Sequence, residues 1–316
     1  MLIISLALFL VSCLVLVASG GYLIKLLIKI ASYLRLSEFV VAFIIMAFST
    51  SVPELFVGIS SAINRNPALS LGNVIGSNIA DLTIIIGIAA LLGKGIKIKN
   101  PFIKKDSLFM FLIALVPIAL MIFDRNLSRI DGVILFSIFL IYMWHLAKER
   151  RELKERFKEQ NTKHFVITVG FFIICLCILF FSAHFIVKYA TELSVDLLLP
   201  PIIMGLFLVA IGTSLPELVF ETRAVLAKKG DLAVGDAMGS VVCNSTLVLG
   251  VTAIIYPITS NFLLFLTSAI FMAIIAFLFM IFIRNKKGLS ITDSVTLIIL
   301  YILFILFEFY FKSKIF

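Results

Sequence analysis

Residues 47–55 read Ala-Phe-Ser-Thr-Ser-Val-Pro-Glu-Leu, and residues 210–218 read Ala-Ile-Gly-Thr-Ser-Leu-Pro-Glu-Leu. Further along, residues 72–81 (Gly-Asn-Val-Ile-Gly-Ser-Asn-Ile-Ala-Asp) correspond to residues 235–244 (Gly-Asp-Ala-Met-Gly-Ser-Val-Val-Cys-Asn). The offset is 163 residues in both cases, and no gap is needed. Each copy thus places a carboxylate beside a proline in an apolar stretch, which is costly in lipid and typical of an ion pathway.

The two copies form an internal duplication in a chain with the composition of a membrane protein. Thirteen of the fifty positions in 41–90 are identical in 204–253. Hydrophobic residues make up 62% of the chain and the mean hydropathy is +1.18, far above the values of soluble domains. A bilayer core of about 30 Å takes about 20 apolar residues per helix. The expected spans are 2–30, 38–63, 69–93, 106–123, 130–147, 165–190, 198–226, 231–257, 260–283 and 291–311.

This pattern predicts an all-α integral membrane protein with ten transmembrane helices. Five spans lie in the first half (1–147) and five in the second (164–316), and the hydrophilic link 148–163 joins them. Because five is an odd number, the second half enters the membrane from the opposite side. We therefore expect two inverted five-helix repeats with broken helices at the centre, as in alternating-access carriers.

The net charge of +9 could suggest a nucleic-acid partner, but its distribution argues against one. Of the 27 Lys and Arg residues, 21 lie on the links that alternate to one side of the ten spans, and six lie on the other side. The positive-inside rule places the richer side, with link 148–163, in the cytoplasm and both termini outside. We expect a multi-pass protein of the cell membrane, surrounded by lipid, with no obligatory protein partner.

The proline of each copy loosens its helix next to a set of oxygen atoms. Pro53 and Pro216 lack an N–H, so the carbonyl four residues before each loses its helical partner. In a membrane, such carbonyls must meet protein, water or an ion. Thr50 and Glu54 lie four residues apart and share a helix face, as do their counterparts in the second copy. These carboxylate, hydroxyl and carbonyl oxygens suit Na⁺ and Ca²⁺.

The next span supplies a second polar face. Ser77 lies four residues before Asp81, and Ser240 lies four residues before Asn244. The Gly-x-x-x-Gly spacing ahead of each serine allows helices to approach closely. A single copy would indicate packing alone, but duplication of the whole set favours a shared cation site.

Two further acidic positions occur in the second copy only. Asp236 stands where the first copy has Asn73, and both residues are possible additions to the site. Asp236 fits a proton or ion route and equally fits bonding to backbone near a helix start. Glu221, one helical turn beyond Glu217, stays unassigned.

The Thr-Ser-x-Pro-Glu and Gly-x-x-x-Gly-Ser blocks resemble the two alpha-repeats of the sodium/calcium exchanger superfamily, the cation/Ca²⁺ antiporters. The resemblance extends over essentially the whole chain, including the charged link between spans five and six. It implies alternating access to a central site that carries Ca²⁺ against Na⁺ or H⁺, with K⁺ in some members, and no cofactor. The ligands that it implies are Thr50, Ser51, Glu54, Ser77, Asp81, Thr213, Ser214, Glu217, Ser240 and Asn244, with backbone oxygens of Ala47 and Ala210.

The chain departs from the family pattern at the carboxylate of the second motif. Prokaryotic members carry Asn in the first repeat and Asp in the second, whereas Asp81 and Asn244 are reversed here. Val241 also stands where the first repeat has Asn78. Three central carboxylates balance three Na⁺, whereas one Ca²⁺ leaves a single surplus charge that a proton could remove. We expect Ca²⁺/Na⁺ antiport, with Ca²⁺/H⁺ or K⁺-dependent exchange as the alternative.

An intramembrane enzyme is the alternative from a different class. Val234-Gly235-Asp236 resembles the glycine–aspartate element of intramembrane aspartyl proteases. That chemistry needs a second membrane aspartate in a Tyr-Asp pair, and the sequence has none. It also lacks a His-Glu-x-x-His motif. We therefore expect a transporter and no enzyme activity.

The charge distribution yields a test of topology. Single cysteines introduced at either terminus and in the 124–130 link should react with an impermeant reagent from outside the cell, and cysteines in 148–163 only after permeabilisation. Labelling of the two termini from opposite faces would contradict both the ten-span count and the inverted repeat.

Overall fold

The computed structural model describes residues 2–33, 51–99, 102–149, 162–285 and 288–312. The first half holds α1 (Leu2–Tyr33), α3 (Val52–Ile63), α4 (Pro67–Ala80), the π-helix η1 (Asp81–Ile85), α5 (Ile86–Leu92), β1 (Ile96–Lys97), α6 (Phe102–Asp124), β2 (Asn126–Leu127) and α7 (Arg129–Glu149). The second half holds α8 (Thr162–Asp196), α9 (Pro201–Met204), η2 (Gly205–Val209), α10 (Ala210–Thr213), α11 (Leu215–Leu226), α12 (Gly230–Cys243), η3 (Asn244–Val248), α13 (Leu249–Ile255), β3 (Ile258–Thr259), α14 (Phe262–Asn285), β4 (Gly288–Leu289) and α15 (Ile291–Lys312).

The expected all-α membrane class is confirmed. Within the described residues, seven helices are long and apolar enough to cross a membrane, or eight if the bent pair 201–213 and 215–226 counts as one span. The helix bounds follow the expected spans closely, as at α6, which was expected over 106–123. Residues 34–50, which include the first half of the second expected span (38–63), lie outside the described ranges. The ten-span count therefore stays a prediction.

The proline-linked break is present in the second copy. α10 ends at Thr213, Ser214 takes φ −86° and ψ 8°, and α11 starts at Leu215 with a bend of 43°. Ser51 has nearly the same conformation, φ −83° and ψ 3°, directly before α3. Both prolines occupy the first turn of the helix that follows, where a missing N–H costs nothing.

Two π-helices start at matching positions of the duplicated segments. η1 begins at Asp81 and η3 at Asn244, which are 163 residues apart. Inside each, a threonine hydroxyl donates to the carbonyl four residues before it, Thr83 to Ile79 and Thr246 to Val242. A π-helix inserts an extra residue into the turn and is frequent at functional sites. It therefore changes how the residues of these two helices face the centre of the bundle.

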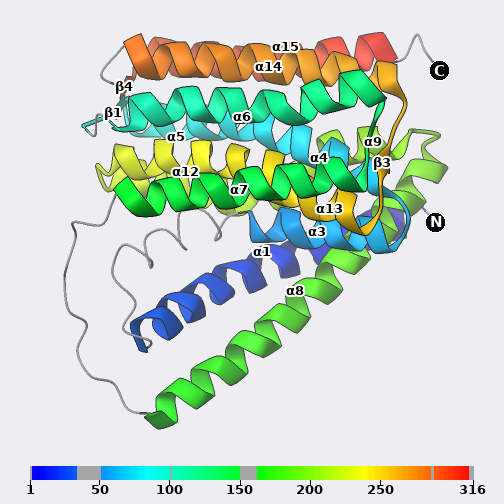
Figure 1. The fold of residues 1–316 in the computed structure, drawn as a ribbon, viewed down its shortest axis with the longest axis horizontal. Helices are drawn as coiled ribbons and strands as arrows, with labels where there is room; N and C mark the ends of the chain where they lie inside the picture. The colour runs from blue at the N-terminus through cyan, green and yellow to red at the C-terminus, as the bar shows by residue number, and fades with distance from the viewer. Residues whose placement is uncertain (1, 34–50, 100–101, 150–161, 286–287, 313–316) are drawn as a thin grey trace.

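Short two-stranded sheets tie the halves together at the ends of the bundle. β1 pairs antiparallel with β4, and β2 pairs antiparallel with β3. Figure 1 shows β1 and β4 at one end of the bundle and β3 at the other. Each sheet takes one strand from each half, so the halves are joined at both ends. The long helices α1 and α8 lie side by side along one flank of the bundle (Figure 1).

Glycines let α4 approach the broken helix of the second half closely. A Cβ at Gly72 would lie 2.0 Å from the carbonyl oxygen of Ile202, and one at Gly76 would lie 2.1 Å from that of Leu206. Gly205 faces the carbonyl oxygen of Leu69 in the same way, at 2.1 Å. The close approach expected from the first Gly-x-x-x-Gly spacing is confirmed, and it brings α4 against α9 and η2.

This contact predicts a large difference between two glycine substitutions. Gly72→Ala should lower the free energy of unfolding by about 2 kcal/mol or more, because the methyl group would overlap backbone that cannot rotate away. Gly170→Ala on α8 is the matched control, since nothing lies within 4 Å of its Cβ position. Thermal unfolding in detergent measures both, and equal melting temperatures would contradict the tight α4 contact.

Candidate functional site

Three carboxylates from both halves are buried in the interior of the bundle. Glu54 lies at the start of α3, Asp81 at the start of η1, and Glu217 at the start of α11. Each has 0% of its surface exposed. None of their six oxygen atoms has a hydrogen-bond partner among the described residues. Buried carboxylates without partners are costly, so this arrangement would be stabilised by a group that neutralises them.

The carboxylates are close enough to interact electrostatically, and hydroxyls of the second half lie near two of them. When ionised, Glu217 repels both Glu54 and Asp81. The Thr213 hydroxyl lies near Glu54, and the Ser214 hydroxyl lies near Asp81, without hydrogen-bond geometry. Residues from the second half thus complete the surroundings of carboxylates from the first half. Electrostatic repulsion among fixed groups of like charge favours a cation between them.

A first hydrogen-bonded group joins α4 to α10. Thr213 Oγ1 donates to Asn73 Oδ1 at 3.2 Å, and the hydroxyls of Thr213 and Ser77 are 3.4 Å apart. Thr213 also lies 3.4 Å from the carbonyl oxygen of Ala210, which already accepts a hydrogen bond from the Ser214 N–H at 3.0 Å. The sequence listed all these residues as candidates, and the structure brings them together.

A second group joins α4 to η3, and sequence reasoning missed its central member. Asn78 Nδ2 donates to Ser245 Oγ at 3.0 Å, while Asn244 Nδ2 donates to Asn78 Oδ1 at 3.2 Å. The Oδ1 atom of Asn244 keeps no hydrogen-bond partner among the described residues. Asn78 has no polar counterpart in the second half, where Val241 stands, so the duplication signal did not reveal it.

The remaining candidates fall into three groups. Ala47 and Thr50 lie outside the described residues. Ser51 is buried, and its hydroxyl lacks a hydrogen-bond partner within the described ranges. Ser240 is buried on α12. Asp236 is buried on the same helix and, when ionised, repels both Glu54 and Glu217.

The site is a set of mixed oxygen donors. In the described part of the chain, no three His, Cys, Asp or Glu side chains are grouped closely enough to hold a metal ion by themselves. A hard cation here would need hydroxyl, amide and backbone oxygens in addition to carboxylates, which is the usual ligand mixture for such ions.

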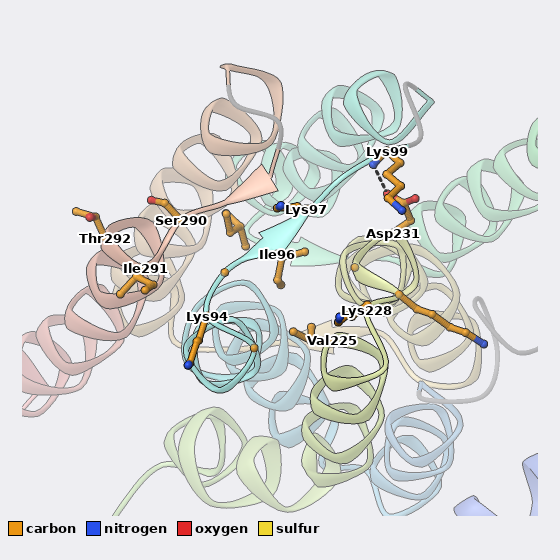
Figure 2. Close-up of a pocket in the computed structure, with 15 residues that line it drawn as sticks. Lys94, Ile96, Lys97, Lys99, Val225, Lys228, Asp231, Ser290, Ile291 and Thr292 are labelled. Carbon is orange, nitrogen blue, oxygen red and sulfur yellow. Dashed lines mark hydrogen bonds between the residues drawn. The ribbon is translucent and has the colours of Figure 1, made fainter.

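A basic depression lies at one end of the bundle. It has a volume of about 890 Å³ and is formed by the segment after α5, the α11–α12 turn, β4 and the start of α15. Figure 2 shows Lys94, Lys97, Lys99 and Lys228 around it, with the Lys99 backbone N–H donating to Asp231 at 2.8 Å. These residues belong to the links that are expected to face the cytoplasm, so the depression fits the positive-inside pattern.

Comparison with known proteins shows the family. The sequence matches the family described as "Sodium/calcium exchanger protein" over residues 4–148 and 167–310. The chain belongs to this family. Its family-level class is therefore that of a multi-pass membrane cation antiporter and not of an enzyme, and the resemblance drawn from the two motifs is confirmed.

Relatives of several origins are similar over most of the chain. The sodium/calcium exchanger MaX1 of Methanosarcina acetivorans is 30% identical, and the match covers 93% of this chain and 95% of that protein. The inner membrane protein YrbG of Escherichia coli is 27% identical over 79% of this chain and 80% of its own length. The solved structure of the sodium–calcium exchanger NCX_Mj soaked with Na⁺ has the same fold, with a TM-score of 0.68, 24% identity, and coverage of 96% and 99%.

Proposed function

We propose that this protein is a secondary antiporter that exchanges Ca²⁺ for Na⁺ across the cell membrane by alternating access to a central site. The observation that carries the proposal is the burial of Glu54, Asp81 and Glu217 without hydrogen-bond partners among the described residues. Uncompensated carboxylates in a membrane interior are expensive, and bound cations would offset that cost. The names of the relatives, MaX1 and NCX_Mj, support the same pair of ions.

In this proposal, the ions are held by oxygen atoms from both halves. Glu54, Asp81 and Glu217 supply the negative charge. The neutral side-chain donors are Ser51, Ser77, Thr213, Ser214, Ser240 and Asn244, with the carbonyl oxygen of Ala210. Thr50 and the carbonyl oxygen of Ala47 belong to the part of the chain that is not described. The possible additions are the neutral Asn73 and the acidic Asp236. Ca²⁺ takes six to eight oxygen ligands, so one Ca²⁺ would use many of the donors that several Na⁺ would otherwise share. Competition for these donors is the physical basis of exchange.

The proposal includes the inverted repeat and its orientation, with both termini outside and link 148–163 in the cytoplasm. Supporting features are the π-helices at matching positions and the two sheets at opposite ends of the bundle (Figure 1). In such repeats, rocking of one half against the other exposes a fixed site to each side in turn. The bend at Ser214 next to the carboxylates offers a place for that movement.

Ca²⁺/H⁺ exchange is the second candidate, because the second repeat carries extra buried acids. Asp236 and Glu221 are fully buried, and the first repeat has Asn73 and Gly58 at these positions. An ion-gradient experiment separates the candidates. Ca²⁺ uptake into proteoliposomes should follow an imposed Na⁺ gradient, and uptake that follows only a pH or K⁺ gradient would replace the Na⁺ proposal.

Removal of either glutamate charge should abolish exchange. Glu54→Gln and Glu217→Gln each keep the size of the side chain but remove one negative charge from the ligands around the ion. We expect Ca²⁺ affinity to fall roughly a hundredfold or more, equivalent to about 3 kcal/mol. Radiolabelled Ca²⁺ flux and binding measure the effect in correctly inserted protein. Near-normal flux in either variant would remove the central site from the proposal.

The reversed Asp81 and Asn244 give a sharper test of the shared site. Both residues start a π-helix, and they correspond in the duplication. Asp81→Asn alone should lose Na⁺-driven Ca²⁺ uptake, and the double variant Asp81→Asn with Asn244→Asp should recover part of it. The double exchange restores three central carboxylates with little change in side-chain volume.

Complete recovery is not expected, because the inward-facing and outward-facing states need not present the two positions equally. We expect a changed apparent Ca²⁺ affinity on one side of the membrane. If the double variant is inserted and folded but as inactive as Asp81→Asn, the two positions are not equivalent and Asn244 has a separate role, such as its hydrogen bond to Asn78.

A further inference from the structure

Glu221 is a buried carboxylate that the central site does not explain. It has 0% of its surface exposed, and neither oxygen has a hydrogen-bond partner among the described residues. It lies four residues after Glu217 on α11. At about 1.5 Å per residue, that displacement carries it about 6 Å along the helix, towards the α11–α12 turn.

Asp236 lies at the same depth on the neighbouring helix. α11 and α12 pack together as a hairpin, joined by residues 227–229. Glu221 is five residues before the last residue of α11, and Asp236 is six residues after the first residue of α12. Counted from the turn, the two carboxylates are therefore level. Asp236 is also the group that repels Glu221 most strongly when both are ionised, ahead of Asp81.

The first repeat has no such pair. The counterpart of Glu221 is Gly58, where an added Cβ would lie 2.6 Å from the Thr252 hydroxyl. The counterpart of Asp236 is Asn73, a neutral residue that accepts the hydrogen bond from Thr213. The same level of the first hairpin is thus tightly packed and uncharged. The acidic pair belongs to one side of the transport path only.

The basic side chains of the hairpin do not share the burial of the pair. Arg223, Lys228 and Lys229 are exposed, whereas both carboxylates are fully buried. Together with the three central carboxylates, Glu221 and Asp236 make five fully buried acids among the described residues of the duplicated segments 41–90 and 204–253. When all five are ionised, their charge exceeds what three Na⁺ or one Ca²⁺ neutralise. A bound cation at the pair would reduce this surplus where burial makes it most costly.

We propose that Glu221 and Asp236 bind a Na⁺ ion of their own, one helical turn from the central site towards the face that carries link 148–163. Na⁺ fits better than Ca²⁺ because the pair offers three oxygens without a hydrogen bond among the described residues, both of Glu221 and Oδ2 of Asp236, far short of the six to eight that Ca²⁺ takes. A Na⁺ ion that enters or leaves the central site through that face would bind at this subsite on its way. This subsite deepens the proposed antiport function and rests on it.

Binding of radiolabelled Na⁺ to the purified full-length protein tests the subsite without transport. Glu221→Gln and Asp236→Asn should each bind one Na⁺ fewer per protein at saturation than the wild type. The matched control is Glu308→Gln, which removes another fully buried glutamate, on α15, where Ser268 donates to it at 3.1 Å. This control should keep the wild-type Na⁺ stoichiometry. Wild-type stoichiometry in both hairpin variants would overturn the proposal.

A sided transport measurement gives the second readout. In membrane vesicles of either orientation, Glu221→Gln should raise the Na⁺ concentration for half-maximal exchange by about tenfold, the equivalent of one lost charged contact. The shift should appear only when Na⁺ is supplied on the face that carries link 148–163. Equal shifts on both faces, or loss of all cation binding in folded Asp236→Asn, would place the residues in the central site and overturn a separate subsite.

Two comparisons keep the outcomes apart. If Glu217→Gln retains exchange, the proposed function fails whatever Glu221 does. If Glu217→Gln is inactive while both hairpin variants match the wild type in stoichiometry and in Na⁺ dependence on both faces, only the subsite fails. Should Glu221→Gln not fold, Asp236→Asn carries the same test. The shorter Glu221→Asp then serves as a control, because it keeps the charge and should keep the wild-type Na⁺ stoichiometry.

Discussion

Mutual repulsion among buried carboxylates is the constraint around which this bundle is arranged. Glu54, Asp81 and Glu217 are removed from water and left without hydrogen-bond partners in the described structure. In a low-dielectric interior this arrangement would favour separation of the helices that carry them. The helices are instead fixed by contacts that do not involve the charges, which would preorganise the proposed site for cations.

Those fixing contacts are backbone approaches and neutral hydrogen bonds. Gly72, Gly76 and Gly205 bring α4 against the broken helix of the second half, closer than any side chain would allow. Asn78 then bridges α4 to η3 through Asn244 and Ser245. Such polar contacts between membrane helices are individually modest, commonly about 1 kcal/mol. Their value lies in holding α4 and η3 in register, so that Asp81 and Asn244 stay at fixed positions beside the glutamates.

Much of this arrangement could be predicted from the sequence because it is local or duplicated. Span positions follow from apolar length, and the break at Ser214 follows from Pro216. The two glutamates stood out because each occurs in an apolar stretch and because Glu54 recurs as Glu217 at the constant offset. The features that could not be predicted from the sequence depend on contacts between segments. A π-helix at Asp81 or Asn244 has no local signature, since its extra residue is accommodated by neighbouring helices.

The residues missed by sequence reasoning share one property, which is that the duplication does not repeat them. Asn78 faces Val241 in the alignment, and Glu308, which accepts a hydrogen bond from Ser268 on α14, lies outside the repeated motifs. Glu221 was noticed only as an unassigned neighbour of Glu217. Comparison of the two halves identifies residues that occur in both and misses residues that occur in one half only.

Differences between the two repeats are what would let the two sides of the membrane differ in ion affinity. A carrier with two identical halves would present the same ion affinity to both sides of the membrane, whatever the gradients. Here the two halves have π-helices and hairpins in equivalent places, but their charges differ. Asp81 corresponds to Asn244 in the duplication, and Gly58 corresponds to Glu221. Changing a side chain leaves helix packing nearly intact, whereas changing a helix would not. Unequal ion binding at the two faces is therefore most simply reached by substitution of charge on a matched backbone, and the α11–α12 hairpin carries such differences from the first repeat at Glu221 and Asp236.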